Sequence, residues 1–211
     1  MEEIPLDSSP DSSADAPVAA APARHFLLHK PYGYLCQFGS GARAERNKKF
    51  LGLLGDFPPG TMPIGRLDED SEGLLLLTTD GRVSERIRRK DVEKEYYAQV
   101  DGVLTDAAVA QLAAGVEIVY RTDVYRTLPC RAERLDAAPD FAPRSRKIRD
   151  DRHGPTSWVR LTINEGKFRQ VRKMTAAVGC PTLRLVRVRV GQQTLGDLPP
   201  GAWREVAELR A

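Results

Sequence analysis

The chain has 211 residues and a formal net charge of +3, a length that suits one large domain or two small domains sharing a cleft. Its hydrophobic content of 41% is sufficient for a buried core, but no apolar run approaches the roughly 18 residues of a membrane span. The N-terminus lacks the basic and apolar segments of a secretory signal, so we expect a cytoplasmic protein with no membrane partner. The three cysteines, Cys36, Cys130 and Cys180, form no C-x-x-C motif, which argues against a disulfide framework or a zinc site.

The charge is distributed unevenly along the chain. Residues 1–24 hold five acidic residues and one base, and they are rich in Ala, Pro, Ser and Asp. Because such a segment can bury almost nothing, we expect residues 1–24 to form a disordered tail. The remainder holds 31 basic and 24 acidic residues, a net charge of +7, which is compatible with a polyanionic partner.

The first half of the remaining chain alternates short apolar segments with polar turns. In chain order it predicts a strand at 25–30, a strand at 34–38, a polar loop at 39–49, a short element at 51–60, a strand at 74–77 and a helix at 82–90. The four leucines at 74–77 are too few for a free-standing helix and end at a Thr-Asp-Gly turn. They therefore predict a strand that is buried on both faces.

The second half contains longer elements and one irregular segment. In chain order it predicts a strand at 95–100, a helix from Thr105 to Gly115, short strands within 116–135, a mobile Pro- and Arg-rich segment at 136–157, a strand at 158–163, a helix at 168–179 and a strand at 183–191. The helix at 168–179 places Phe168 on its apolar face. The last strand changes phase between Leu185 and Val186, which predicts a bulge or burial on both faces. Strands dominate without a βαβ repeat, so we expect an α+β fold with a large, mostly antiparallel sheet flanked by helices.

An acidic cluster lies directly before the four leucines, in the stretch GRLDEDSEGLLLLTTDG at residues 65–81. Asp68, Asp70 and Glu72 alternate as in a calcium-binding EF-hand loop, but Thr79 stands where such a loop needs a bidentate glutamate. A second interpretation is a charged turn facing solvent, which suits the other three acids better than Asp68. A third applies to Asp68 alone, because rigid core neighbours would hold it at the edge of the sheet as a nucleophile or base requires.

The same stretch resembles the catalytic motif of the pseudouridine synthases, in the RsuA-type branch that acts on ribosomal RNA. Three further stretches agree: HKPYG resembles the family's Lys-Pro turn, KEYYAQVDG its tyrosine motif, and EGKFRQVRKMTAAVGCPTLRLVRVRVG its third motif. Ser71 and Thr79 depart from the more usual threonine and asparagine. The resemblance implies a pseudouridine synthase fold over residues 25–211, with two subdomains that share one mixed sheet and a central catalytic cleft.

One departure from the family concerns the N-terminus. Most RsuA-type members begin with a basic S4 RNA-binding domain, whereas only the acidic tail precedes the core here. The family's short members, which act on the 23S RNA of the large ribosomal subunit, also lack this domain. We therefore expect a monomer without an S4 domain that acts on large-subunit RNA and needs no cofactor or metal.

The resemblance also implies three catalytic residues, Asp68, Tyr96 and Arg172. The reaction breaks the N1–C1′ bond of a uridine and rejoins the base through C5, so Asp68 would attack C1′ as a nucleophile or take a proton from C2′. Arg172 would lower the pKa of this carboxylate, which closure over RNA would otherwise raise. Tyr96 rather than Tyr97, which points to the opposite face of the strand, would stack on the extruded base.

The remaining implied residues contact the substrate. Arg66 would fill the gap left by the extruded base or would instead pair with Glu69 or Asp70, and Val171 would pack against the base. Residues 166–196 contain no acid and form a basic stretch that would bind phosphates. Its expected RNA contacts are Lys167, Arg169, Lys173, Arg184 and Arg187, and the expected extensions of the track are Lys30 and the cluster at 144–149.

Two other functions are alternatives. A glycoside hydrolase could use Asp68 with Glu72 or Asp70, but it needs two carboxylates about 5–9 Å apart across a sugar site. The two tryptophans, Trp158 and Trp203, are distant from these acids in sequence. A non-catalytic ribosome-assembly factor with the same fold would predict that Asp68→Asn leaves the biological role unchanged.

Overall fold

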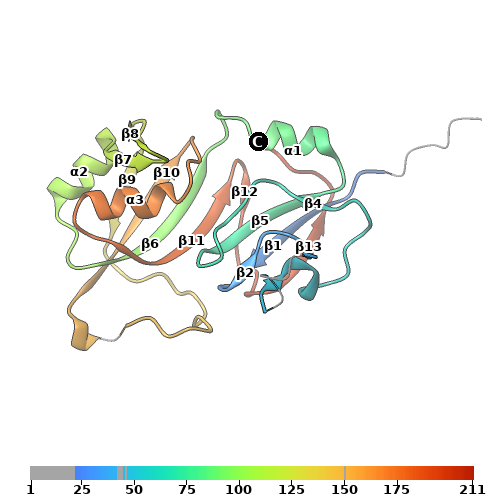
Figure 1. Ribbon diagram of the computed structural model, residues 1–211, viewed down its shortest axis with the longest axis horizontal. Helices are drawn as coiled ribbons and strands as arrows, with labels where there is room; N and C mark the ends of the chain where they lie inside the picture. Colours follow the sequence, from blue (N-terminus) through green and yellow to red (C-terminus); the bar gives the residue numbers. More distant parts are fainter. Residues whose placement is uncertain (1–21, 42–44, 46, 150) are drawn as a thin grey trace, which may run out of the picture.

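The computed structural model describes residues 22–41, 45, 47–149 and 151–211 (Figure 1). The tail expected at 1–24 lies outside these residues except for its last three. Of those, Arg24 is tied to the sheet, because its backbone nitrogen donates to Thr79 Oγ1 at 2.9 Å and its guanidinium pairs with Glu205. None of the helices in the described part is both long and apolar enough to cross a membrane.

One large sheet runs through the described part and contains nine strands. They are β1 (His25–Lys30), β4 (Met62–Pro63), β5 (Glu72–Thr78), β6 (Lys94–Asp101), β9 (Arg131–Leu135), β10 (Thr156–Ile163), β11 (Thr182–Val190), β12 (Gln193–Thr194) and β13 (Trp203–Val206). Their order is β13–β1–β5–β11–β6–β10–β9, with β12 beside β11 and β4 beside β5. Only β5 and β11 pair parallel within this sheet, which confirms the mostly antiparallel α+β fold class.

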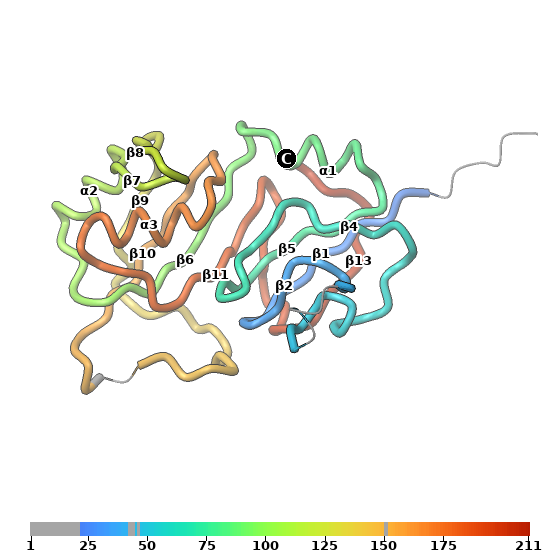
Figure 2. Tube along the Cα trace, in the orientation of Figure 1, coloured from blue at the N-terminus to red at the C-terminus, as the bar shows by residue number. Residues whose placement is uncertain are grey.

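Helices and two small strand pairs complete the described fold. They are β2 (Tyr34–Leu35), β3 (Lys49–Phe50), η2 (Leu51–Leu53), α1 (Gly81–Ile87), α2 (Asp106–Ala114), β7 (Glu117–Tyr120), β8 (Asp123–Arg126), η3 (Asp151–His153) and α3 (Gln170–Ala177). β2 pairs with β3, and β7 pairs with β8. Figures 1 and 2 show α2, α3, β7 and β8 beside the half of the sheet that contains β6, β10 and β9, whereas α1 lies beside the other half.

The leucine strand β5 is buried along its full length, as predicted. Leu74 and Leu76 belong to one apolar cluster, which also contains two side chains of α1. Leu75 and Leu77 belong to a second cluster together with Phe26 of β1. Because successive side chains of a strand point to opposite faces, this run fills the cores on both sides of the sheet.

The other half of the sheet packs against α2 and α3 in a third apolar cluster. Leu112 of α2, Met174 of α3 and Leu161 of β10 are all fully buried in it. α2 begins at the predicted N-cap, where Thr105 Oγ1 accepts a hydrogen bond from the backbone nitrogen of Ala108 at 3.2 Å. The cap satisfies a helix donor that would otherwise be unpaired.

α3 begins later than the sequence predicted. Arg169 adopts a left-handed conformation with φ of 54°, and the helix begins at Gln170 rather than at Phe168. The reversal of the backbone at Arg169 turns the Phe168 side chain away from the core, and it is 66% exposed. The prediction that the helix includes Phe168 on its apolar face is therefore wrong.

Other segments differ in smaller ways. The strand expected at 34–38 is reduced to Tyr34–Leu35, and β10 begins at Thr156, two residues earlier than expected. β11 has register shifts on both sides of the predicted position, between Thr182 and Arg184 and between Arg187 and Arg189. The predicted irregularity of the last strand is thus confirmed.

The segment at 136–157, expected to be mobile, is irregular but makes defined contacts with the sheet. The Phe141 ring lies 6.0 Å from the Tyr97 ring and 5.9 Å from the Trp158 ring. Arg149 forms an ion pair with Asp101 at the end of β6. The contacts hold residues 141–149 against the protein on the side of β6 that carries Tyr97.

Candidate active site

Asp68 lies in the turn between β4 and β5, at the start of the leucine strand. Gly65 supplies a positive φ of 71°, which most other residues avoid. The Leu67 side chain is buried, and the carbonyl of Asp68 accepts from the nitrogen of Ser71 at 3.0 Å. The Asp68 side chain is 25% exposed, so the core holds the turn while the carboxylate faces outward.

Lys30 stabilises this turn from the interior of the protein. Its side chain is fully buried, and its ammonium donates to the carbonyl oxygens of Ser71 at 2.7 Å, Pro31 at 3.0 Å and Glu69 at 3.4 Å. Burial lowers the pKa of Lys30 to about 8. The ammonium is therefore used inside the protein, which is against the expectation that Lys30 contacts RNA phosphates.

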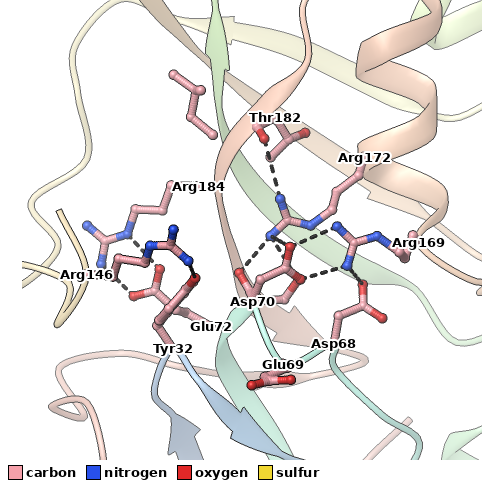
Figure 3. Close-up of polar contacts among 12 residues, drawn as sticks. Tyr32, Asp68, Glu69, Asp70, Glu72, Arg146, Arg169, Arg172, Thr182 and Arg184 are labelled. Carbon is pink, nitrogen blue, oxygen red and sulfur yellow. Dashed lines mark hydrogen bonds and ion pairs between the residues drawn. The ribbon is translucent and has the colours of Figure 1, made fainter. Parts of the chain in front are cut away.

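The four acids of the cluster pair with three cations, and Figure 3 shows Asp68 and Asp70 near Arg169 and Glu72 near Arg184. The pairs are Glu69 with Lys48 at 2.8 Å, Asp70 with Arg169 at 2.8 Å, Glu72 with Arg184 at 2.8 Å, and Asp68 with Arg169 at 3.7 Å. Because each carboxylate points to a guanidinium or ammonium, they do not converge as a calcium loop requires. The interpretation of a solvated turn is also wrong for Glu72, which is 2% exposed.

Arg169 and Arg172 both bind Asp70 more closely than Asp68. Arg169 forms two hydrogen bonds of 2.8 Å with the two carboxylate oxygens of Asp70. Arg172 Nη2 donates to the Asp70 carbonyl at 2.7 Å and lies 3.3 Å from Ser71 Oγ. The sequence predicted Arg172 as the partner of Asp68, but in this structure the nearer guanidinium is that of Arg169.

The electrostatic consequence differs between the two aspartates. Burial raises the pKa of Asp68, and the charges of Arg169, Arg172 and Lys30 oppose this without reversing it, while Asp70 adds to the increase. The pKa of Asp70 is lowered despite its burial, because Arg169 donates to it and Arg172 lies close. Asp68 is thus the less favourably ionised carboxylate of the two, as expected for a reactive group in a cleft.

A cavity of about 320 Å³ opens in front of Asp68. The expected site residues among its lining are Arg66, Asp68, Tyr96, Lys167, Arg169 and Val171. Tyr96 faces the cavity, whereas Tyr97 on the opposite face of β6 packs against Phe141. Among the described residues, Asp68 is the only acid that lines the cavity, and these residues do not form the two-carboxylate site of a glycoside hydrolase.

Two aromatic residues line the cavity that the sequence analysis did not assign to the site, Phe168 and Tyr120. The Lys167 ammonium lies 4.9 Å from the centre of the Tyr120 ring, which ties the β7–β8 pair to the loop before α3. Only Phe168 could have been assigned to the site from the sequence. It lies between Lys167 and Arg169 just after Gly166, a setting that also suits an exposed loop residue.

The remaining expected RNA contacts are placed unequally. Arg66 is exposed at the cavity and forms no ion pair with Glu69 or Asp70. Lys173 donates to the carbonyl of Val119 at 2.7 Å and remains partly accessible.

Arg184 and Arg187, in contrast, are 6% and 5% exposed. Arg184 is bound to Glu72, and Arg187 Nε donates to the Leu74 carbonyl at 2.8 Å. Burial of both guanidinium groups is against the expectation that they contact phosphates.

Comparison with known proteins agrees with the fold. The family described as RNA pseudouridylate synthase matches residues 24–177. A ribosomal large subunit pseudouridine synthase E of Xanthomonas campestris pv. campestris is 45% identical over 187 residues, covering 88% of this chain and 96% of that protein. A protein of the same name from Vibrio parahaemolyticus is 40% identical over 184 residues, covering 85% of this chain and 72% of that protein.

A solved structure gives the same result. A crystal structure of a pseudouridylate synthase superimposes with a TM-score of 0.68 at 29% identity, covering 88% of this chain and 71% of that chain. The fold is therefore that of a pseudouridine synthase. The chain belongs to the RNA pseudouridylate synthase family, and within it the chain is similar to the proteins named ribosomal large subunit pseudouridine synthase E.

Proposed function

We propose that this protein isomerises one uridine of large-subunit (23S) ribosomal RNA to pseudouridine in the cytoplasm, acting as a monomer. The observation that carries the proposal is the half-buried Asp68 carboxylate, which faces a cavity lined by Tyr96 and by cationic side chains. The names of the similar proteins support ribosomal RNA of the large subunit as the substrate.

The chemistry needs one carboxylate beside the ribose. Asp68 attacks C1′ or removes the C2′ proton, and either step breaks the N1–C1′ bond and frees the uracil to turn. C5 of the base then bonds to C1′ as the Asp68–C1′ bond breaks, or as Asp68 returns the proton to C2′. C5 loses its proton and N1 gains one, so no oxidant or donor is consumed. The Tyr96 ring stacks on the extruded base, an interaction worth about 1–3 kcal/mol. Val171, buried at the wall of the cavity, packs against it.

The arginines hold this arrangement. Arg172 fixes the catalytic turn through the Asp70 carbonyl, and Arg169 supplies the positive charge nearest to Asp68. Arg66 is exposed at the entrance of the cavity, where it can occupy the space that the extruded base leaves in the RNA. Lys167 and Lys173 provide phosphate contacts beside the same entrance.

Tritium release tests the proposed function. Purified protein is incubated with protein-free 23S ribosomal RNA labelled with tritium at uracil C5, and released tritium is counted. We expect release to stop at one equivalent per RNA, because one position is modified. Carbodiimide-stop sequencing then identifies the position. Release from 16S RNA alone, or from neither RNA, would contradict the proposed substrate.

The charge of Arg169 should determine the pH at which kcat/KM falls on the acid side of the pH profile. Asp68 must be ionised to react, so kcat/KM falls as the pH falls through its raised pKa. Arg169→Gln removes the nearest positive charge and leaves Asp70 with Arg172 as its remaining cationic partner, and both changes raise the pKa of Asp68 further. We expect the acid limb of the pH profile of tritium release to move to higher pH. Arg169→Lys, which keeps the charge, should move it less, and a limb that is unchanged or shifted to lower pH would contradict this role.

A further inference from the structure

A second cavity lies on the other side of the Asp70–Arg169 pair. It has a volume of about 360 Å³, and we call it the basic cavity. Of the residues that the structure describes, six cationic side chains and one carboxylate, that of Asp70, line it. The cations are Arg144, Arg146, Lys147, Arg149, Arg169 and Arg172. Figure 3 shows Tyr32 and Arg146 on one side of Asp70, with Arg169 and Arg172 on the other.

Two arginines of the 136–155 loop, the segment between β9 and β10, are positioned by neutral groups, whereas its Arg149 pairs with Asp101. The Arg144 guanidinium lies 4.4 Å from the centre of the Tyr32 ring, and its nitrogens donate to the carbonyls of Arg146 at 2.8 Å and Leu183 at 3.2 Å. Arg146 Nη1 donates to the Tyr32 hydroxyl at 3.2 Å. These contacts fix the direction of each guanidinium and leave its positive charge intact, which is the arrangement that suits an anionic ligand.

Two buried donors of the cavity wall are unsatisfied. Within the described residues, neither Arg149 Nε nor Arg172 Nε has a hydrogen-bond acceptor. The Arg172 side chain is 10% exposed, and burial lowers its pKa, as the neighbouring Arg169 and Arg144 also do. An unpaired buried donor is unfavourable, and an acceptor-rich anion in the cavity would satisfy it.

The basic cavity is adjacent to the catalytic one. Arg169 lines both cavities, and its Nη1 atom lies 3.7 Å from Asp68 Oδ2 and 2.8 Å from Asp70 Oδ1. An anion held in the basic cavity is therefore next to the nucleotide on which Asp68 acts. Resting on the proposed function, we infer that the basic cavity binds a backbone phosphate of the RNA strand adjacent to the target uridine.

The assignment gives the 136–155 loop a role in substrate binding. The loop contacts Tyr32, which lines the basic cavity, through Arg144 and contacts the sheet through Phe141, and these contacts hold its cations at the cavity. Phosphate binding would also explain why six cations lie around one cavity, since their mutual repulsion opposes folding. The site recognises the backbone, so it adds affinity and register but no base specificity.

A charge-neutralising pair tests the inference. Arg146→Gln combined with Lys147→Gln removes two cations of the cavity and leaves the residues at Asp68 untouched. Binding of wild type and variant to a labelled 23S RNA fragment is measured from 50 to 300 mM salt, together with kcat and KM for tritium release. We expect the slope of log K against log salt to become shallower by about 0.7 for each lost phosphate contact. KM should rise about 10-fold or more while kcat stays within twofold.

The matched control is Arg82→Gln combined with Arg126→Gln, which removes two exposed arginines that line neither cavity. The inference is overturned if the cavity variant keeps the wild-type slope and KM, or if the control changes them equally. Thermal melting of both variants shows that the fold is retained. Binding is measured without catalysis, so wild-type protein that binds RNA but releases no tritium would refute the proposed function and not this inference.

Discussion

Asp68→Asn is expected to abolish tritium release, lowering kcat/KM by at least about 10⁴-fold. The amide is isosteric with the carboxylate but can neither form a bond to C1′ nor accept the C2′ proton at neutral pH. RNA affinity should stay within a few-fold, because the cationic side chains that line both cavities are unchanged. The measurement is single-turnover tritium release, combined with RNA binding by the same preparation.

The stability of Asp68→Asn provides a check on the fold. Burial raises the pKa of Asp68, which means that the ionised carboxylate is less favourable in the folded than in the unfolded chain at neutral pH. Loss of the charge should therefore leave the melting temperature unchanged or higher. Glu69→Gln is the matched control, since Glu69 is the neighbouring acid and its exposed pair with Lys48 does not line the catalytic cavity. Activity of Asp68→Asn within tenfold of wild type would refute the assignment and favour a non-catalytic assembly factor.

The family resemblance implied Asp68 and Tyr96, and the local sequence pattern around each residue is consistent with its place at the cavity. The four leucines predict the strand that follows Asp68, because four consecutive apolar residues bounded by turns fit a strand that is buried on both faces. Strand alternation separates Tyr96 from Tyr97, and the cavity lies on the Tyr96 side. Both features depend on residues close together in the chain, so they can be read before the fold is known.

The partners and burial of the arginines could not be predicted from local sequence pattern. Arg184 and Glu72 are 112 residues apart in sequence, and only the parallel pairing of β5 with β11 brings them together. Without that register, Arg184 looks like one more cation of a basic stretch. The choice between Arg169 and Arg172 as the neighbour of Asp68 depended on one backbone angle, the positive φ of Arg169, which sequence periodicity does not report.

The buried pair of Glu72 with Arg184 should be the electrostatic contact on which stability depends most. Glu72 is 2% exposed, the Arg184 side chain is 8% exposed, and two hydrogen bonds of 2.8 and 3.0 Å join them. Glu72→Gln keeps the shape but leaves a buried guanidinium without its counter-charge, which costs about 3–5 kcal/mol. For a chain of this length we expect the melting temperature to fall by about 6–20 °C.

A double variant distinguishes the loss of the ion pair from the cost of leaving one charge buried alone. Glu72→Leu combined with Arg184→Met removes both charges, so no uncompensated ion remains in the sheet, and we expect it to recover most of the free energy of unfolding that Glu72→Gln loses. Glu69→Gln, which breaks the exposed pair with Lys48, should cost no more than about 1 kcal/mol. Calorimetry or urea unfolding of the four proteins measures these differences. Equal losses for Glu72→Gln and Glu69→Gln would mean that the buried pair contributes no more than a surface ion pair, and that packing of β5 against β11 alone holds the catalytic turn in place.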